Sequence, residues 1–198
     1  MTFRNYYNKA INENSDDSDE HLIGQGKYFK TFEIVDEEGV IKRPIQGGNI
    51  SETEIKKHQF MKNHENTNVF VKIFKIAPKY IWEEKVDIKQ GINICRSFAR
   101  IYLDISGDGS KFNDSDKRSD FILKALDPLN SIIDWNWWKK IVQDDISNPV
   151  FESSKYLLNL QERMSKITSW PVKEFDIHAE NVGVVNRNGS KMLVVIDF

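Results

Sequence analysis

Three polar residues near the end of the sequence could act together chemically. Asp176 and Asn181 lie five residues apart, and Asp197 follows after two short apolar segments, 182–185 and 192–196. The turn between those segments contains Asn-Gly, a pair typical of a tight β-hairpin. Such a hairpin would return Asp197 to the side of Asn181, although 16 residues separate them. The pattern predicts carboxylate and amide oxygens gathered at one end of a hairpin, the groups that accept protons and bind hard cations.

The surrounding residues resemble a known family. The stretch 175–181, Phe-Asp-Ile-His-Ala-Glu-Asn, and the stretch 195–198, Val-Ile-Asp-Phe, resemble the catalytic loop and the DFG-like Asp-Phe of the protein-kinase-like fold. They are especially similar to aminoglycoside- and choline-kinase-type enzymes and to kinase-like proteins of bacteriophages. The resemblance implies that Asp176 orients the attacking hydroxyl, while Asn181 and Asp197 bind Mg²⁺ beside ATP.

Earlier residues match the same family in order. Gly24 and Gly26 resemble the start of a Gly-rich phosphate loop, in which backbone N–H groups approach the phosphates. Phe29 stands where the third glycine of the usual pattern would fall. Lys42, in Val-Ile-Lys, resembles the phosphate-binding lysine of the third strand. Glu54, on the next helix, would then be its catalytic ion-pair partner.

Alternatives remain open around that lysine. Glu52 could be its partner instead of Glu54, and a Lys–Glu pair alone is more often a solvated surface pair. The stretch Val-Phe-Val-Lys ending at Lys72 also looks like the lysine motif. In the preferred register that stretch belongs to a fourth strand, over 68–76. A fifth strand follows, and Glu83 to Lys85 form the hinge that binds adenine through its backbone.

The elements that position these residues follow from hydrophobic patterning. Strands are predicted before the glycines at 24–26, over 31–35 and around 40–42, because β-branched and aromatic residues alternate there. Acidic residues directly after Ser51 indicate a helix start, and the helix should end near Asn63. A later helix presents one apolar face at Leu157, Leu160, Met164 and Ile167.

The predicted fold is therefore α+β, with the two lobes of the protein-kinase-like fold. Residues 1–20 would be a polar, acidic arm, and 21–87 a β-rich N-lobe with one helix. Residues 88–198 would be a partial helical C-lobe that holds the catalytic loop and the C-terminal hairpin. The middle of the chain contains Trp135, Trp137 and Trp138, which favour either helix packing or a partner-binding patch.

Composition excludes several classes. The 198 residues carry 28 basic and 30 acidic side chains, a net charge of −2, which disfavours a strongly basic nucleic-acid binder. The single cysteine, Cys95, permits neither an internal disulfide nor a cysteine-based zinc cluster. The apolar runs are too short to span a membrane, and the start lacks a secretory h-region. We expect a cytoplasmic protein, in the host cytoplasm if it is phage-encoded.

Two functions of different classes fit these features. The first is an ATP- and Mg²⁺-dependent kinase that phosphorylates a Ser/Thr-type hydroxyl of a protein, or, less favoured, of a small molecule. The second is a catalytically idle kinase-like module that binds and regulates a partner protein. The families that the sequence resembles continue past the DFG-like segment, whereas this sequence stops at Phe198. A platform for a peptide substrate is therefore not expected within these residues.

Overall fold

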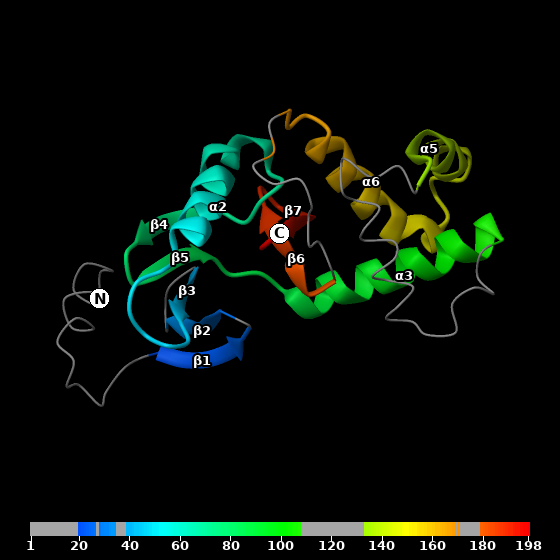
Figure 1. The fold of residues 1–198 in the computed structure, drawn as a ribbon. Coiled ribbons are helices and arrows are strands. Elements are labelled where there is room, and N and C mark those ends of the chain that lie inside the picture. Colours follow the sequence, from blue (N-terminus) through cyan, green and yellow to red (C-terminus); the bar gives the residue numbers. More distant parts are fainter. Residues whose placement is uncertain (1–19, 27, 35–38, 108–132, 169, 171–178) are drawn as a thin grey trace. The chain divides into compact units, whose positions relative to one another are not determined.

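The computed structural model describes most of the chain (Figure 1). The described residues form a mixed α+β protein with a five-stranded antiparallel sheet, a two-stranded hairpin and several helices. This confirms the predicted α+β class, and the assignment to the kinase-like fold stays a prediction. The described residues are 20–26, 28–34, 39–107, 133–168, 170 and 179–198.

The chain divides into two compact units. The first unit, here called the sheet unit, comprises Met1–Ser51 and Phe74–Glu84. The second, here called the helical unit, comprises Glu52–Ile73 and Lys85–Phe198. The predicted helix after Ser51 therefore groups with the helical unit by its contacts. The predicted limits at residues 20 and 87 stay predictions.

The sheet unit consists of five strands in the order β1-β2-β3-β5-β4. Ile41 on β3 lies opposite Phe32 on β2 and Trp82 on β5, and these apolar residues share one face because side chains alternate along a strand. Ile34 and Tyr80 are buried with Ile41 in a small core. The strand bounds are β1 Glu20–Gln25, β2 Phe29–Ile34, β3 Gly39–Pro44, β4 Ile73–Ala77 and β5 Tyr80–Glu84.

The helical unit is built from longer helices with clear end signals. Asp87 accepts a hydrogen bond from the backbone N–H of Gln90 at the start of α3, and Asp134 caps α5 in the same way. Gly107 ends α3 in the left-handed conformation, with φ of 79°. The helix predicted to end near Asn63 is confirmed. The helices are α2 Glu52–Asn63, α3 Ile88–Ser106, α5 Trp135–Asp144 and α6 Glu152–Met164, with short 3₁₀ turns at Glu65–Thr67, Pro149–Phe151 and Ala179–Asn181.

Aromatic and aliphatic side chains from these helices form the core of the helical unit. Trp138 on α5 is fully buried, and its ring lies 5.1 Å from Tyr102, 5.9 Å from Phe98 and 6.0 Å from Phe151. Trp138 is therefore a packing residue, while Trp137 is 39% exposed. The predicted apolar face of the later helix is confirmed for Leu157, Leu160 and Met164, which lie on α6 and are buried. Ile167 is also buried, but it lies beyond the end of the helix.

The C-terminal hairpin consists of β6, Val182–Arg187, and β7, Ser190–Val195. Asn188 and Gly189 both have positive φ, 53° and 75°, as a two-residue type I′ turn requires. Val182 lies opposite Val195 at the other end of the hairpin. The hairpin and its Asn-Gly turn are therefore confirmed.

The predicted strand over 68–76 is wrong as one element, since the stretch is divided between the units. Phe70 forms a parallel bridge with Val195: the N–H of Val71 donates to the carbonyl of Val195 at 3.0 Å, and the N–H of Val195 donates to that of Val69 at 2.8 Å. The sheet strand β4 begins afterwards, at Ile73. Burial of Phe70 in the helical unit explains why this part of the run leaves the sheet.

Helix α3 approaches β6 unusually closely. A Cβ atom at Gly91 would lie 2.6 Å from the carbonyl oxygen of Val182, and a Cβ at Gly183 would lie 2.7 Å from Val86. Glycine at position 91 lets the backbone of α3 touch that of β6, and glycine at position 183 leaves room for the Val86 side chain just before the helix. The start of α3 is thus held directly against the strand that follows Asn181.

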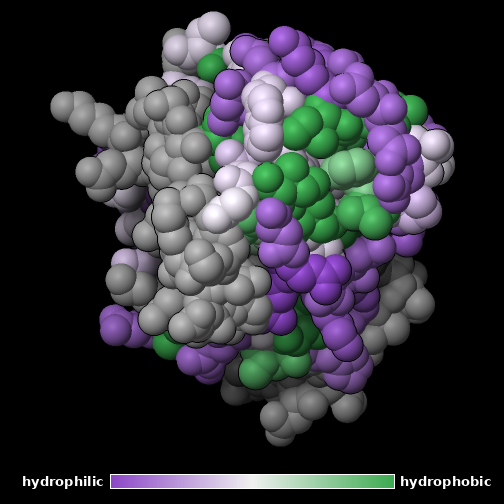
Figure 2. Space-filling model, turned by 90° about the vertical axis from the view of Figure 1, so that its right-hand side faces the viewer, coloured by the Kyte–Doolittle hydropathy of each residue, from purple (hydrophilic) through white to green (hydrophobic). Residues whose placement is uncertain are grey.

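One face of the helical unit carries apolar side chains. Figure 2 shows the side that lies at the right of Figure 1, where hydrophobic residues gather at the centre and hydrophilic ones surround them. Along α5 and α6 runs a groove of about 820 Å³, lined among others by Trp135, Lys139, Leu158 and Glu162.

No described helix is both long and apolar enough to cross a lipid bilayer.

Candidate functional site

The end of the hairpin brings two of the predicted residues together. The N–H of Ile196 donates to the carbonyl of Asn181 at 2.9 Å. Asp197 therefore comes one residue after a direct backbone contact with Asn181, and both follow from the register in which Val182 faces Val195. The predicted return of Asp197 to the side of Asn181 is confirmed as geometry within the helical unit.

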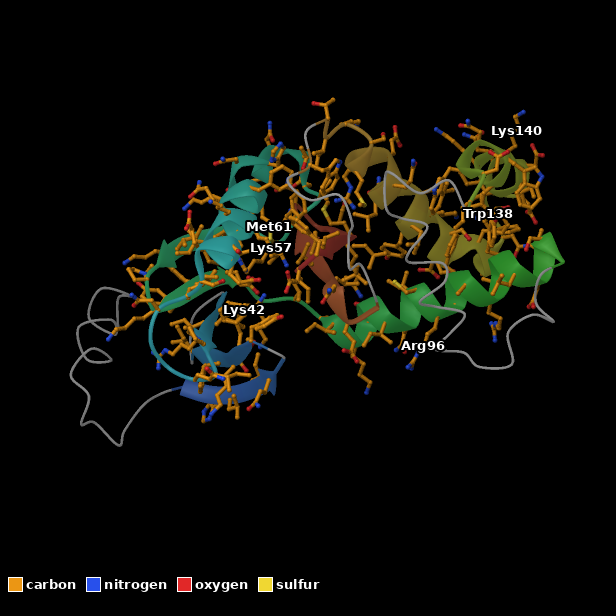
Figure 3. The ribbon with its side chains drawn as sticks, in the orientation of Figure 1. Lys42, Lys57, Met61, Arg96, Trp138 and Lys140 are labelled. Atoms are coloured by element: carbon orange, nitrogen blue, oxygen red, sulfur yellow. The ribbon has the colours of Figure 1, made fainter. Side chains whose placement is uncertain are left out.

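One carboxylate oxygen of Asp197 lies near both a backbone N–H group and a lysine ammonium group. Its Oδ1 accepts a hydrogen bond from the N–H of Phe198 at 2.8 Å and lies 3.5 Å from Nζ of Lys57. The same Nζ lies 3.7 Å from Oε1 of Glu54. Figure 3 labels Lys57 on α2. Lys57 is not among the residues predicted from the sequence, and its spacing of three residues from Glu54 on one helix face is the signal that could have indicated it.

Phe198 holds the end of the chain in place through aromatic contacts. It is 3% exposed, and its ring lies 5.9 Å from Phe60, 5.7 Å from Phe70 and 6.2 Å from Trp170. Nζ of Lys57 lies 5.8 Å from the centre of the same ring. Because several large rings surround Phe198, the backbone at Asp197 is tied to α2 and to the bridge at Phe70.

Two arginines fix the neighbouring bridge. Arg163 on α6 donates to the carbonyls of Asn68 and Leu193. Arg187 donates to Oδ1 of Asn68 and to the carbonyl of Phe70, and both Arg187 bonds are 3.0 Å long. Burial and the neighbouring charge of Arg187 lower the pKa of Arg163 to about 10. These contacts clamp the 68–71 segment beside β7, so they support the strand that leads to Asp197.

Lys42 lies on the central strand of the sheet unit and is engaged there. Its Nζ lies 2.8 Å from Oε1 of Glu83 on β5, and the two side chains are only 13% and 4% exposed. The Cα partner of Lys42 across the sheet is Ile81, so the pair is diagonal. The alternative lysine, Lys72, lies outside the named strands. Figure 3 labels Lys42 on β3.

Gly24 and Gly26 are not demanded by the fold itself. Gly24 in β1 pairs with Thr31 in β2, next to an irregularity of the ladder. Gly26 donates its N–H to the carbonyl of Phe29 at 2.9 Å. A Cβ at Gly24 would meet nothing within 4 Å, and one at Gly26 would only reach the carbonyl of Phe29 at 4.0 Å. Neither glycine has a positive φ. The space beside the Cα atoms of both glycines is therefore open, whereas the N–H of Gly26 is already engaged by Phe29.

The remaining predicted residues divide between the units. The sheet unit holds Lys42 and Glu83, whereas the helical unit holds Glu54 and Lys85. The predicted Lys42–Glu54 pair and the predicted hinge at Glu83 to Lys85 therefore stay predictions. The predicted catalytic Asp176 lies outside the described residues.

The oxygens at the hairpin end suit a hard cation. Mg²⁺ usually keeps several waters and binds one or two carboxylates together with substrate phosphates, rather than a full protein cage. Asn181 and Asp197 would supply one amide and one carboxylate to such an ion. Within the described ranges, no group of three or more His, Cys, Asp or Glu residues could hold a metal alone. Binding of a Mg²⁺ ion together with a nucleotide at these two residues therefore stays a prediction.

Neither a protein-family model nor a curated protein matches the sequence.

Proposed function

We propose that this protein is an ATP- and Mg²⁺-dependent phosphotransferase that phosphorylates a hydroxyl group, with a Ser/Thr-type hydroxyl of a protein as the favoured acceptor. The observation that supports this most is the pairing of Asn181 with the segment that carries Asp197 at one end of the hairpin. Asn181 is the last residue of the 3₁₀ turn Ala179–Asn181, which follows Asp176 in the sequence. That arrangement suits a metal ion that neutralises phosphate charge.

The proposed reaction assigns each residue a task. Asp176 accepts the proton of the acceptor hydroxyl as its oxygen forms a bond to the γ-phosphorus. The bond from that phosphorus to the β–γ bridging oxygen breaks, and ADP leaves. Asn181 and Asp197 hold Mg²⁺, which supplies charge neutralisation. Lys42 binds phosphate oxygens, and the open backbone at Gly24 and Gly26 approaches them.

Nucleotide binding followed by transfer is the direct test. ATP with Mg²⁺ should raise the melting temperature, and labelled γ-phosphate should pass to the protein itself or to lysate proteins. Asp176→Ala should reduce the rate of phosphate transfer by at least about a hundredfold, because it removes the group that accepts the proton. Asp104→Ala, an exposed aspartate on α3, is the matched control and should keep full activity.

Two results would count against this function. Mg²⁺-dependent ATP binding without any Asp176-dependent transfer would favour the idle module that binds a partner protein. No thermal shift with ATP and no Asp176-dependent transfer would together rule out the kinase activity and leave only the idle module.

A further inference from the structure

We infer that Lys57 is a built-in competitor of the divalent cation: its ammonium group balances Asp197 when metal is absent and must withdraw when metal binds. This inference rests on the proposed function, because it concerns the same carboxylate. It goes beyond that function in assigning a positioning residue which sets the metal concentration at which the site fills.

The geometry begins with one ammonium between two carboxylates. Nζ of Lys57 lies 3.5 Å from Oδ1 of Asp197 and 3.7 Å from Oε1 of Glu54. Lys57 and Glu54 are three residues apart on α2, whereas Asp197 is 140 residues away in the chain. The position of Lys57 near Asp197 is therefore produced by packing α2 against the end of the hairpin, within the helical unit.

The Lys57–Asp197 contact is loose. Charge-assisted N–H···O bonds in proteins are usually about 2.7–2.9 Å long, and both of the Lys57 contacts are longer than that. The Lys57 and Asp197 side chains are 22% and 34% exposed, so water can replace either partner. Pairs that water can reach contribute less to stability than fully buried ones. The ammonium can therefore leave Asp197 at small cost.

A place for the displaced ammonium is already present. Glu54 has a side chain that is only 12% exposed and lies on the same helix as Lys57. A metal ion on Asp197 would lie within a few ångströms of Lys57, and like charges at that distance repel. Lys57 would then move toward Glu54, which keeps its charge paired. Glu54 thus favours the metal-bound arrangement, and Lys57 opposes it.

The test uses Mn²⁺ alone as the probe, titrated against the full chain and followed by electron paramagnetic resonance. Lys57→Gln should tighten Mn²⁺ binding by about tenfold, because it removes a positive charge next to the ion. Lys57→Arg keeps the charge and should stay close to the wild type. The advantage of Lys57→Gln should shrink as salt rises from about 20 mM to about 500 mM, since salt screens the repulsion.

Lys56→Gln is the matched control. Lys56 is the neighbouring residue on α2, its side chain is 72% exposed, and it pairs with Glu52 at 2.7 Å. Lys56→Gln changes the net charge by the same amount as Lys57→Gln. Because the Lys56 side chain is exposed to solvent and salt, this variant should keep its Mn²⁺ affinity within about twofold of the wild type. Glu54→Gln provides a variant of opposite sign. It removes the alternative partner of Lys57 and should weaken Mn²⁺ binding by about threefold.

Asp197→Asn separates the two ways of failing. If Mn²⁺ binds in an Asp197-dependent manner, but Lys57→Gln binds it no more tightly than the wild type or Lys56→Gln, the inference about Lys57 is overturned and the metal site stands. If no Asp197-dependent Mn²⁺ binding occurs in any variant, the metal site of the proposed function falls, and the role of Lys57 falls with it. Should Lys57→Gln not fold, the Glu54→Gln result decides, because unchanged or tighter binding there contradicts the competition.

Discussion

The two units treat a lysine–carboxylate pair in opposite ways. In the sheet unit, Lys42 and Glu83 lie 2.8 Å apart on adjacent strands, with side chains 13% and 4% exposed. In the helical unit, Lys57 and Asp197 lie 3.5 Å apart with side chains 22% and 34% exposed. The first pair is close and removed from water, while the second is long and partly solvated.

The difference teaches what each pair can do. Two buried charges depend on each other, because removing one leaves the other without compensation in a poorly solvated place. A partly solvated pair can exchange partners with little loss, since water replaces the missing contact. Loss of either Lys42 or Glu83 should therefore be costly, whereas the Lys57–Asp197 pair leaves a carboxylate available for other ligands.

The largest expected effect tests this contrast directly. Lys42→Met should lower the free energy of unfolding by about 3–5 kcal/mol, because the buried Glu83 would lose the ammonium that lies 2.8 Å from it. Lys57→Met should lower it by only about 0–1 kcal/mol. Urea denaturation of both variants measures the difference, with Lys56→Met as the exposed control. Equal losses for Lys42→Met and Lys57→Met would refute the contrast.

A smaller loss is expected where the helical unit packs backbone against backbone. Gly91→Ala places a Cβ 2.6 Å from the carbonyl oxygen of Val182, so α3 must shift away from β6. Overpacking of this kind typically costs about 1–3 kcal/mol. Thermal melting should record the loss. Gly107→Ala is no control, because Gly107 has φ of 79°, and Gly24→Ala serves instead.

Burial of a thiol in the helical unit should also make the free energy of unfolding depend on pH, with an effect of intermediate size. Burial raises the pKa of Cys95 from 9.0 to about 12. The folded thiol therefore keeps its proton over a range in which the unfolded thiol has lost it. Its stabilisation is complete below pH 9 and is lost as the pH rises toward 12, at up to about 1.4 kcal/mol per pH unit.

Cys95→Ala provides the comparison for that effect. The stability difference between wild type and Cys95→Ala should fall between about pH 9 and pH 10 by roughly 1 kcal/mol. Unfolding by urea at a series of pH values measures it. A difference that stays constant over this range would show that the thiol is not held neutral by burial.

The smallest expected effect on stability belongs to the open glycines. Gly24→Ala and Gly26→Ala should change the melting temperature by no more than about 1 °C, because the added Cβ meets no closer atom than 4.0 Å. The same changes should weaken ATP binding by about threefold to tenfold if phosphates approach this backbone. Unchanged nucleotide affinity in both variants would remove the glycines from the proposed site.

Local signals in the sequence were sufficient for several elements. Asn188 and Gly189 predicted the hairpin because few residue pairs tolerate positive φ at both turn positions. The apolar spacing of Leu157, Leu160 and Met164 predicted a buried helix face. The stretch around Phe70 does not form the single strand that was predicted. Alternation within a short segment does not reveal with which strand the backbone will form hydrogen bonds.

The sequence by itself determined the hairpin, the helix faces and the return of Asp197 to Asn181, since turn chemistry and apolar periodicity act over a few residues. Tertiary structure alone decided that Lys42 meets Glu83 and that Lys57 meets Asp197. Those partners are 41 and 140 residues apart. Their distances depend on strand register and on helix packing, which are set by the burial of many side chains together rather than by any local motif.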